Sequence, residues 1–373
     1  MKATTNNKGQ QQGMGGNTML KLGAVGALAA AATLGATPVK ADDFKLPPIS
    51  IGAGVRSSFA HVDNASPSKD ANDFTLNSAR IYLGGAVTKE IKLTFNTEYV
   101  GANGSPGSGS VQVIDAIARF EFSPELNIWA GRFLPPSDRS NLYGPYYANN
   151  SQVYTDGVQD GFPAYAAGRA NGVAYWGDFD KLSISAGVFD VPSTVGGPDG
   201  DNVVLAGRVQ YDFWDKEGGY YLNGTYYGAK DLLALGVAAQ STDGNTAVTG
   251  DFLLEKKLGN AGVATVEAEY ASYDGFGGYN AAGAAFTKSD GYYVLASYLF
   301  PQVIGVGKVQ VLGKYGQADY TAFNDFNQKT TEVDLNYIIK DFNARVGLFY
   351  LDTSLSDGLA DTSQFGVQVQ IQI

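Results

Sequence analysis

Regular alternation of apolar and polar residues, in segments of about ten residues, most constrains how this chain can fold. Residues 91–99 read IKLTFNTEY, and residues 365–373 read FGVQVQIQI. Because successive side chains of a β-strand point to opposite faces, each segment predicts a strand with one apolar and one polar face. The repetition favours an all-β, transmembrane antiparallel β-barrel over a soluble sheet, since strands can span lipid only in a closed barrel.

Sixteen segments follow this pattern, and an even number of strands places both ends of the chain on the periplasmic side of a barrel. Residues 218–230 are a weaker candidate for a further strand, so the exact strand number stays open. The predicted strands are 49–60, 73–88, 91–100, 111–122, 126–134, 171–178, 181–190, 202–213, 231–240, 246–257, 262–273, 290–300, 307–320, 329–339, 343–353 and 362–373.

The connections between these strands alternate in length. Short connections are expected at the periplasmic end of a barrel, and long polar ones outside the cell. The short set is 88–90, 123–125, 178–181, 258–262 and 340–343, and the long set is 101–110, 274–289, 321–328 and 354–361. This asymmetry is typical of a membrane barrel and is not expected of a soluble β-sandwich.

The segment 134–169, between the fifth and sixth strands, lacks the alternation. It contains four prolines and five tyrosines. Long connections without secondary structure are uncommon in compact folds unless they are functional, and the aromatic content argues against disorder. We therefore predict a constriction loop that folds into the barrel and narrows the lumen.

Residues 1–41 have the pattern of a cleaved signal peptide. They carry four lysines and no acidic residue, and the apolar stretch LGAVGALAAAATLGA precedes the sequence TPVKA. This stretch is too short to span a bilayer, and the pattern predicts cleavage after Ala41, with Met19 as an alternative start. We therefore divide the chain into a signal peptide, residues 1–41, and a barrel, residues 42–373.

The composition restricts the partners and chemistry of this barrel. Without the leader lysines, 22 Lys and Arg remain against 37 Asp and Glu, a formal charge of −15, which argues against nucleic acid as a partner. The absence of cysteine excludes disulfides, a Cys-zinc site and a thiol nucleophile. The 48 Gly, 23 Tyr and 20 Phe suit strands with aromatic girdles and frequent turns. We find no sequence motif for a cofactor or a metal.

Three segments resemble a known family. They are DAIARFEFSPELNIWAGRFLPPSDRSNL (115–142), GRANGVAYWG (168–177) and LAGRVQYDF (205–213). The chain resembles bacterial outer-membrane porins, and among them the phosphate-selective porin O and P family, which implies a sixteen-stranded and commonly homotrimeric barrel. Two features depart from that family. The sequence ends in Ile373 where such barrels usually end in Phe or Trp, and the loop 134–169 is slightly acidic where phosphate preference depends on arginines and lysines.

If the apolar faces meet lipid, the opposite faces and the constriction loop supply the charges of the lumen, where opposed rows of charge orient polar solutes. A simpler interpretation is that many of these charges pair with one another. The residues predicted to line the pore are Arg56, Arg80, Lys92, Arg119, Asp138, Arg139, Asp156, Asp160, Arg208, Glu267, Glu269 and Lys314. Further inward charges are Glu98, Asp115, Glu121, Asp251, Glu255, Glu332, Asp334 and Arg345, and the alternation does not place Arg132.

These patterns predict a porin in the outer membrane of a Gram-negative bacterium, surrounded by its lipid, that passes small hydrophilic solutes and ions by passive diffusion. A modest anion preference is expected, because Arg56, Arg80 and Arg119 face the acids of the loop. The alternatives are a phosphate- or anion-selective porin, and a non-channel barrel such as an adhesin or an outer-membrane hydrolase. An enzyme is disfavoured, because His61 is the single histidine and its sequence neighbours His-Val-Asp form no recognisable triad.

Overall fold

The computed structural model describes residues 48–64, 70–100, 109–158, 168–190, 202–242, 244–274, 288–321, 326–356 and 360–373. The chain divides into Met1–Leu46 and Pro47–Ile373, and the second unit is a β-barrel. The predicted signal peptide, residues 1–41, lies outside the described residues. In the described part of the chain, no helix combines the length and the apolar character needed to cross a membrane.

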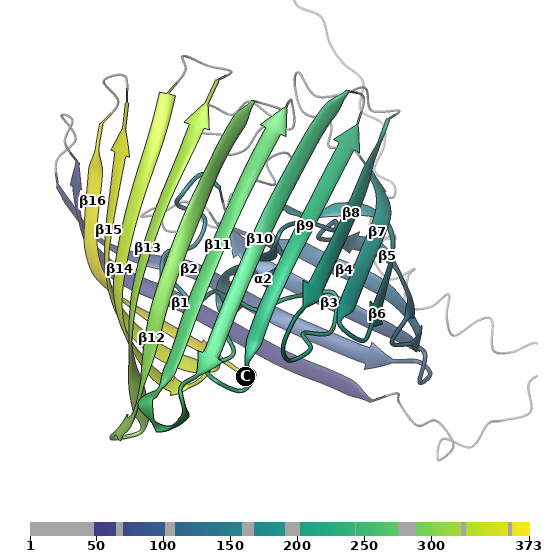
Figure 1. Cartoon of the computed structure of the whole chain (residues 1–373), viewed down its shortest axis with the longest axis horizontal. Helices are drawn as coiled ribbons and strands as arrows, with labels where there is room; N and C mark the ends of the chain where they lie inside the picture. The colour runs from purple at the N-terminus through teal and green to yellow at the C-terminus, as the bar shows by residue number, and fades with distance from the viewer. Residues whose placement is uncertain are drawn as a thin grey trace, which may run out of the picture. The chain divides into compact units, whose positions relative to one another are not determined.

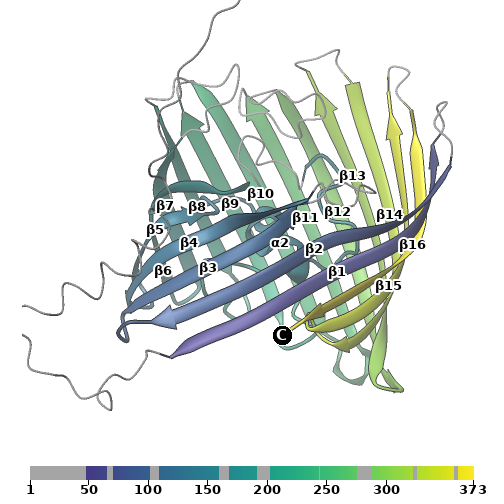
Figure 2. The same ribbon diagram turned by 180° about the vertical axis from the view of Figure 1, so that it is seen from behind.

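Sixteen strands of the described residues close into an antiparallel barrel, in which each strand pairs with its sequence neighbours and β1 pairs with β16 (Figure 1 and Figure 2). The strands are β1 (Ile49–Asn64), β2 (Ala71–Ala86), β3 (Ile91–Val100), β4 (Ser110–Ser123), β5 (Leu126–Phe133), β6 (Ala170–Phe179), β7 (Leu182–Asp190), β8 (Val203–Asp212), β9 (Leu232–Thr242), β10 (Asn245–Lys257), β11 (Val263–Asp274), β12 (Ser289–Ile304), β13 (Gly307–Tyr320), β14 (Phe326–Lys340), β15 (Ala344–Leu355) and β16 (Thr362–Gln372). The predicted fold class is confirmed.

Each of the sixteen predicted spans overlaps one observed strand, and the spans 91–100 and 307–320 match at both ends. The further candidate, residues 218–230, contains no strand. It belongs instead to the connection between β8 and β9. The strands form where the alternation persists, because only there can one face meet lipid while the other faces the lumen.

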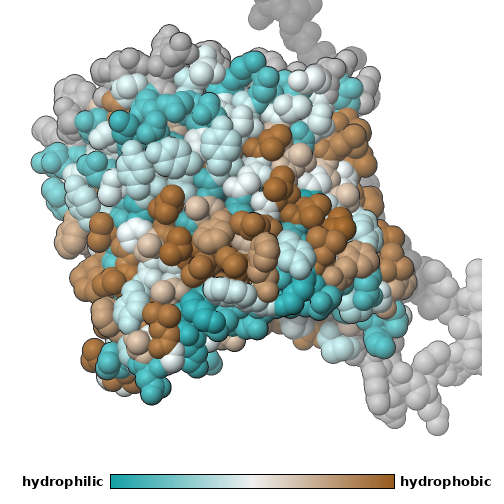
Figure 3. All heavy atoms as spheres, viewed as in Figure 1, coloured by the Kyte–Doolittle hydropathy of each residue, from teal (hydrophilic) through white to brown (hydrophobic). Residues whose placement is uncertain are grey.

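The two faces of the wall differ as the alternation requires. In β10 the buried positions Asp251, Leu253 and Glu255 alternate with the partly exposed Phe252 and Leu254. On the face shown in Figure 3, apolar residues form a band with hydrophilic residues above and below it. An apolar outer band between two polar rims fits a wall that meets the hydrocarbon of a bilayer. Large apolar side chains exposed on the outer face include Val237, Val248, Val294, Val333 and Leu335.

The last strand closes the barrel against the first. Ala53 N donates a hydrogen bond to the Ile373 carbonyl at 3.1 Å, and Ile373 N donates to the Ala53 carbonyl at 2.9 Å. These two bonds extend the β1–β16 ladder to the final residue, so both strands have a partner on each side. Closure removes the unpaired edge that a strand in lipid could not tolerate.

Among the connections that the structure describes, two fold into the barrel. The first joins β5 to β6 and is named the inward loop (residues 134–169, described for 134–158 and 168–169). It carries helix α2 (Arg139–Tyr147), which lies within the ring of strands in Figure 1 and Figure 2. The second is named the β8–β9 connection (residues 213–231). The predicted infolding of the loop after β5 is therefore observed, and the infolding of the β8–β9 connection was not predicted.

Local chemistry determines the course of α2. The Asp138 carboxylate caps the helix by accepting a hydrogen bond from Asn141 N at 3.0 Å. The helix bends at Gly144, whose φ of 62° lies in the left-handed region, and Pro145 follows with no N–H to donate. Because of this bend, the main chain turns its carbonyl groups toward the barrel wall within one short segment.

Candidate functional site

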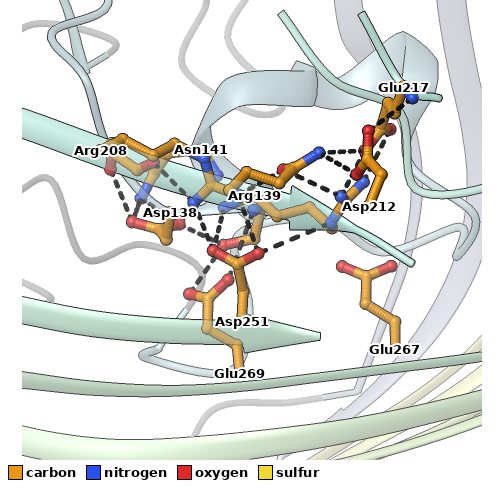
Figure 4. Close-up of polar contacts among 12 residues, drawn as sticks. Asp138, Arg139, Asn141, Arg208, Asp212, Glu217, Asp251, Glu267 and Glu269 are labelled. Carbon is orange, nitrogen blue, oxygen red and sulfur yellow. Dashed lines mark hydrogen bonds and ion pairs between the residues drawn. The ribbon is translucent and has the colours of Figure 1, made fainter. Parts of the chain in front are cut away.

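An ion-pair cluster joins the inward loop, the β8–β9 connection and the wall (Figure 4). Arg139 at the start of α2 donates from Nη2 to Glu217 Oε2 at 2.5 Å and from Nη1 to Glu217 Oε1 at 2.9 Å. Arg208 on β8 donates to both oxygens of Asp251 on β10, at 2.5 and 2.9 Å. Paired hydrogen bonds between guanidinium and carboxylate fix both the distance and the orientation of the two groups.

The Arg139–Glu217 pair is fully buried, since both side chains have 0 % exposure. Burial alone would raise the pKa of the Glu217 carboxyl, but the Arg139 charge and the hydrogen bonds from Arg139, Tyr226 and Gln210 outweigh it. The pKa of Glu217 is therefore lowered from its ordinary value of 4.5. The carboxylate is held in its charged form, so the pair stays ionised in the lumen.

Acidic side chains of β11 hold the first half of α2. Ser140 Oγ donates to Glu269 Oε1 at 3.0 Å, and Tyr143 OH donates to Glu267 Oε1 at 3.0 Å. Tyr293 on β12 also donates to Glu267 Oε1, at 2.6 Å. Each of these acids therefore contacts the inward loop directly.

The next part of the inward loop lies against β13 and β14. Lys314 Nζ and Asp156 Oδ2 form a buried ion pair at 2.5 Å. Ser151 N donates to Glu332 Oε1 at 3.0 Å and to Asp334 Oδ2 at 2.8 Å. These paired acids accept backbone N–H groups that would otherwise be unsatisfied inside the lumen.

Arginines of β15 and β1 hold the carbonyl groups of the same loop. Arg345 Nη1 donates to the carbonyls of Ala148 and Asn149, at 3.0 Å each. Arg56 donates to the carbonyls of Pro145 and Ser151, at 2.7 Å each, and is only 1 % exposed. Arg56 therefore anchors the loop rather than facing open lumen.

The inner surface of β2 to β4, named the β2–β4 wall (Arg80, Lys92, Glu98, Arg119 and Glu121), has a different character. Arg80 pairs with Glu98. Glu121 accepts a hydrogen bond from Lys92 Nζ at 2.7 Å and one from Arg119 Nη2 at 3.2 Å. The Lys92 and Arg119 side chains keep 35 % and 27 % exposure, so they remain accessible to solvent.

A cavity of about 360 Å³ lies beside Lys92 and Arg119 at the short-turn end of this wall. It exists because the neighbouring inward positions carry only Ser50, Gly84 and Ala86, whose side chains are small. At about 30 Å³ per water molecule, it has room for about a dozen waters. The complete lining is Pro48, Ile49, Ser50, Gly84, Gly85, Ala86, Lys92, Leu93, Thr94 and Arg119.

The structure thus divides the twelve residues predicted to line the pore into groups. One group is buried against protein and contacts other protein groups rather than open lumen: Arg56, Asp138, Arg139, Asp156, Arg208, Glu267, Glu269 and Lys314. Arg80 is nearly buried in its pair with Glu98, and Lys92 and Arg119 line the cavity. Asp160 lies outside the described residues. A pore-lining role stays a prediction, and accessible side chains support it only for Lys92 and Arg119.

Sequence reasoning missed Glu217, which completes the ion pair of Arg139. The available signal was the length of its connection, because nineteen residues separate β8 from β9, whereas the other turns at that end have two to five. Arg132, left unplaced by the alternation, is only partly buried, and its Nε donates to the Val113 carbonyl at 3.1 Å. Trp129 on the same strand points inward and is a partner of Arg119. The centroid of its ring lies 5.5 Å from Arg119 Cζ.

His61 does not form part of a catalytic group in the described structure. It is exposed on β1, with Nδ1 3.0 Å from Asn72 Oδ1. Within the described ranges, no three His, Cys, Asp or Glu side chains are grouped so that they could hold a metal ion.

Comparison with known proteins gives a match at the level of structure. No protein-family model matches the sequence, and no curated protein matches it. The anion-selective porin from Comamonas acidovorans is similar with a TM-score of 0.56 and 17 % identity, over 87 % of this chain and 99 % of that one. Salmonella typhi OmpF, in complex with daunomycin, has a TM-score of 0.56 and 16 % identity over 87 % and 98 %.

The outer-membrane channel DcaP of Acinetobacter baumannii has a TM-score of 0.57 and 12 % identity, over 88 % of this chain and 98 % of that one. These likenesses show that the chain has the fold of the bacterial outer-membrane porins. They concern the barrel as a whole, so the narrower resemblance to phosphate-selective porins O and P stays a hypothesis.

Proposed function

We propose that this chain is a porin of the Gram-negative outer membrane that lets small hydrophilic solutes and ions diffuse through its lumen. The observation that carries this proposal is the solvent-accessible Lys92–Glu121–Arg119 group beside a cavity of about 360 Å³. The apolar outer band supports the membrane location, and the accessible charges of Lys92 and Arg119 support passage of polar solutes. In the outer membrane the barrel would be oriented with its short turns toward the periplasm and its long loops outside the cell.

The test is single-channel recording with the mature chain in a planar bilayer. Unboiled protein should run differently from boiled protein on a gel, which identifies the folded barrel. We expect stepwise, ohmic currents from the folded form. A folded barrel that produces no current would overturn the channel proposal and favour the adhesin alternative, and hydrolysis of lipid or peptide by such a barrel would favour the enzyme.

Anion preference is the second proposed property. At the β2–β4 wall, Lys92 and Arg119 share the single carboxylate Glu121, which leaves one net positive charge beside the cavity. Asp138 and Asp156 are buried with their own donors, so they do not offset that charge at this wall. The charges beside the ion path determine ion preference more than the net charge of −15 of residues 42–373 does. Exposed charges farther away are screened over about 8–10 Å at physiological salt.

The zero-current potential in a salt gradient tests this preference. Replacing Lys92 and Arg119 with Gln should shift the potential toward cations, and Glu121→Gln should shift it toward anions. Lys288→Gln is the matched control, because Lys288 belongs to an exposed pair at the long-loop end with 62 % exposure. Equal potentials in all four proteins would show that this wall does not control the ion path. Repeating the gradient with phosphate in place of chloride tests the narrower phosphate hypothesis.

A homotrimer is proposed as the assembled form. Strand β5 has 8 residues and β7 has 9, so the wall is low on this side. At about 3.3 Å per residue and a tilt of about 45°, eight residues rise only about 19 Å. The apolar band of such barrels is about 25 Å tall. Contact with a second copy would cover the part of this side that the short strands leave open.

A further inference from the structure

The β8–β9 connection enters the lumen from the end opposite to the inward loop. It has nineteen residues, whereas the other connections at this end have two to five. A turn between adjacent antiparallel strands needs only a few residues, so the extra length serves another purpose. Its residues Tyr220, Leu222 and Thr225 are buried among lumen groups.

The connection is bonded to the inward loop through the main chain. Gly224 N donates to the Tyr147 carbonyl at 2.9 Å, and Leu222 N donates to the Leu142 carbonyl at 3.4 Å. Both acceptors belong to α2. These bonds do not depend on side-chain identity, so the connection follows the course of the helix itself.

Side chains add to this contact at the start of the inward loop. Tyr220 OH donates to the Leu134 carbonyl at 2.7 Å, and Arg139 Nη1 donates to the Asn223 carbonyl at 2.9 Å. The Tyr220 ring also packs on Trp129, with centroids 4.7 Å apart. The first residues of the inward loop are therefore held from the short-turn end.

Glu217 is the charged centre of the contact. Besides Arg139, its carboxylate accepts from Gln210 Nε2 at 2.8 Å and from Tyr226 OH at 2.5 Å. Each of the three donors comes from a different element, namely α2, β8 and the connection itself. Removing this carboxylate would leave the guanidinium buried without its bidentate partner, which is costly inside protein.

The connection is in turn fixed to the wall by Glu255 on β10. This carboxylate accepts from Thr225 Oγ1 at 2.7 Å, from Tyr226 N at 2.8 Å and from Gly228 N at 2.7 Å. Three donors within four residues of the connection converge on one side chain. The connection is thus a braced structure that can bear on α2 rather than a loose turn.

We propose that the β8–β9 connection is a second constriction element, and that Glu217 is the positioning residue through which it holds α2 in place. The proposal rests on the channel function. The inward loop enters from the long-loop end, and the β8–β9 connection would hold it from the short-turn end. The docked position of α2 would then set the width of the ion path along the β2–β4 wall. A loop released at Arg139 would widen that path intermittently.

Single-channel recording of Glu217→Gln in the otherwise intact mature chain tests the proposal. Loss of one partner of a buried pair costs about 3–5 kcal/mol. At about 1.4 kcal/mol per tenfold change, the time spent in a wider state should rise by about 10² to 4 × 10³. We therefore expect frequent steps to a higher conductance level in Glu217→Gln. A role in barrel stability alone would change the number of channels and leave the conductance of each one unaltered.

Two further variants complete the experiment. Asp231→Asn is the matched control, because Asp231 belongs to the same connection but pairs at the exposed edge with Lys256 on β10, with 34 % exposure. The double variant Arg139→Met with Glu217→Met removes both charges, so it should return toward the wild-type level. Glu255→Gln loosens the connection without touching the ion pair, and it should reproduce the steps if Glu217→Gln fails to fold.

The outcomes separate the two proposals. Wild-type conductance and noise in folded Glu217→Gln, or in folded Glu255→Gln when the first variant does not fold, would overturn the second constriction and leave the channel function intact. Equal steps in Asp231→Asn would also overturn it, since the effect would not depend on contact with α2. Absence of current from the folded wild-type barrel would instead remove the channel function itself.

Discussion

Lys314 on β13 and Asp156 in the inward loop form an ion pair of 2.5 Å in which the side chains keep only 4 % and 1 % exposure. The Lys314 ammonium also lies 4.2 Å from the centroid of the Tyr293 ring. The loop is thus attached to the wall by a charge that has almost no access to water. Removing one partner of such a buried pair costs far more free energy than removing one partner of an exposed pair.

Asp156→Asn should therefore release this part of the inward loop. Removing the carboxylate that pairs with Lys314 costs about 3–5 kcal/mol, which corresponds to about 10² to 4 × 10³ in the opening equilibrium. Hydrogen exchange of the loop amides in detergent should speed up by that order. Asp274→Asn is the control, because Asp274 pairs with Lys288 at 61 % exposure and should change exchange little. Unchanged loop exchange in Asp156→Asn would contradict the assigned anchor.

Acid should weaken the contact between Glu217 and Arg139. The pKa of Glu217 is lowered in the folded protein because the Arg139 charge and hydrogen bonds outweigh burial, and Tyr226 and Asp212 also lie against it. A lowered folded pKa means that the ionised form stabilises the docked state. That contribution is complete above the ordinary value of 4.5 and is lost as pH falls through the lowered pKa.

Wild-type channels should consequently show constant noise from neutral pH down to about 5, and steps to the higher level only in stronger acid. Glu217→Gln should show those steps at all pH values, since it cannot titrate at this position. Identical pH profiles for the two proteins would show that another group controls the acid response.

Gly131 on β5 should not tolerate a side chain. Its φ of 132° is strained for other residues, and an added Cβ would overlap the Ala116 carbonyl oxygen on β4. Gly131→Ala should destabilise the barrel by about 1–3 kcal/mol, seen as a lower temperature for losing the unboiled gel mobility. Gly313→Ala on β13 is the matched control, because no atom lies within 4 Å of the position that its Cβ would take. Equal thermal shifts in the two variants would refute the steric argument.

The low wall predicts where copies of the chain meet. The native chain has no cysteine, so a single introduced thiol reports one position. Ile128→Cys on β5 should crosslink between subunits with a short bifunctional reagent, because its side chain points outward from the low wall with 37 % exposure. Val237→Cys on β9 also points outward, with 60 % exposure, but lies on another side of the barrel, and it should stay uncrosslinked. Crosslinking at position 237 alone would place the contact elsewhere.

The sequence predicted the strands because strand alternation is a local property. In β10, for example, the inward and outward residues from Asn245 to Lys257 follow from period two alone. The short turns and the long loop after β5 were readable for the same reason, since their lengths and proline content are visible without tertiary contacts. The side on which the charged strand residues lie could likewise be inferred, with Arg132 on β5 as the exception.

The location of open lumen could not be predicted, because it depends on where the inward loop comes to rest. Arg56 and Lys92 have the same alternation signal, yet Arg56 is bonded to the loop carbonyls and Lys92 lines a cavity. Period two gives the face of a residue but not what covers that face. Glu217 was missed for a related reason, because its partner Arg139 is 78 residues away in the sequence and no local pattern links them.

The partners of the inward loop also determine when the lumen can fill during assembly. Gln370 Nε2 on β16 donates to the Tyr146 carbonyl at 2.9 Å across 224 residues of sequence, and Arg345 reaches Ala148 across 197. Both groups lie on the last two strands, whereas Arg208 on β8 and Glu269 on β11 hold the start of the loop. During assembly we therefore expect the contacts at the end of α2 to form last, when β15 and β16 join the sheet.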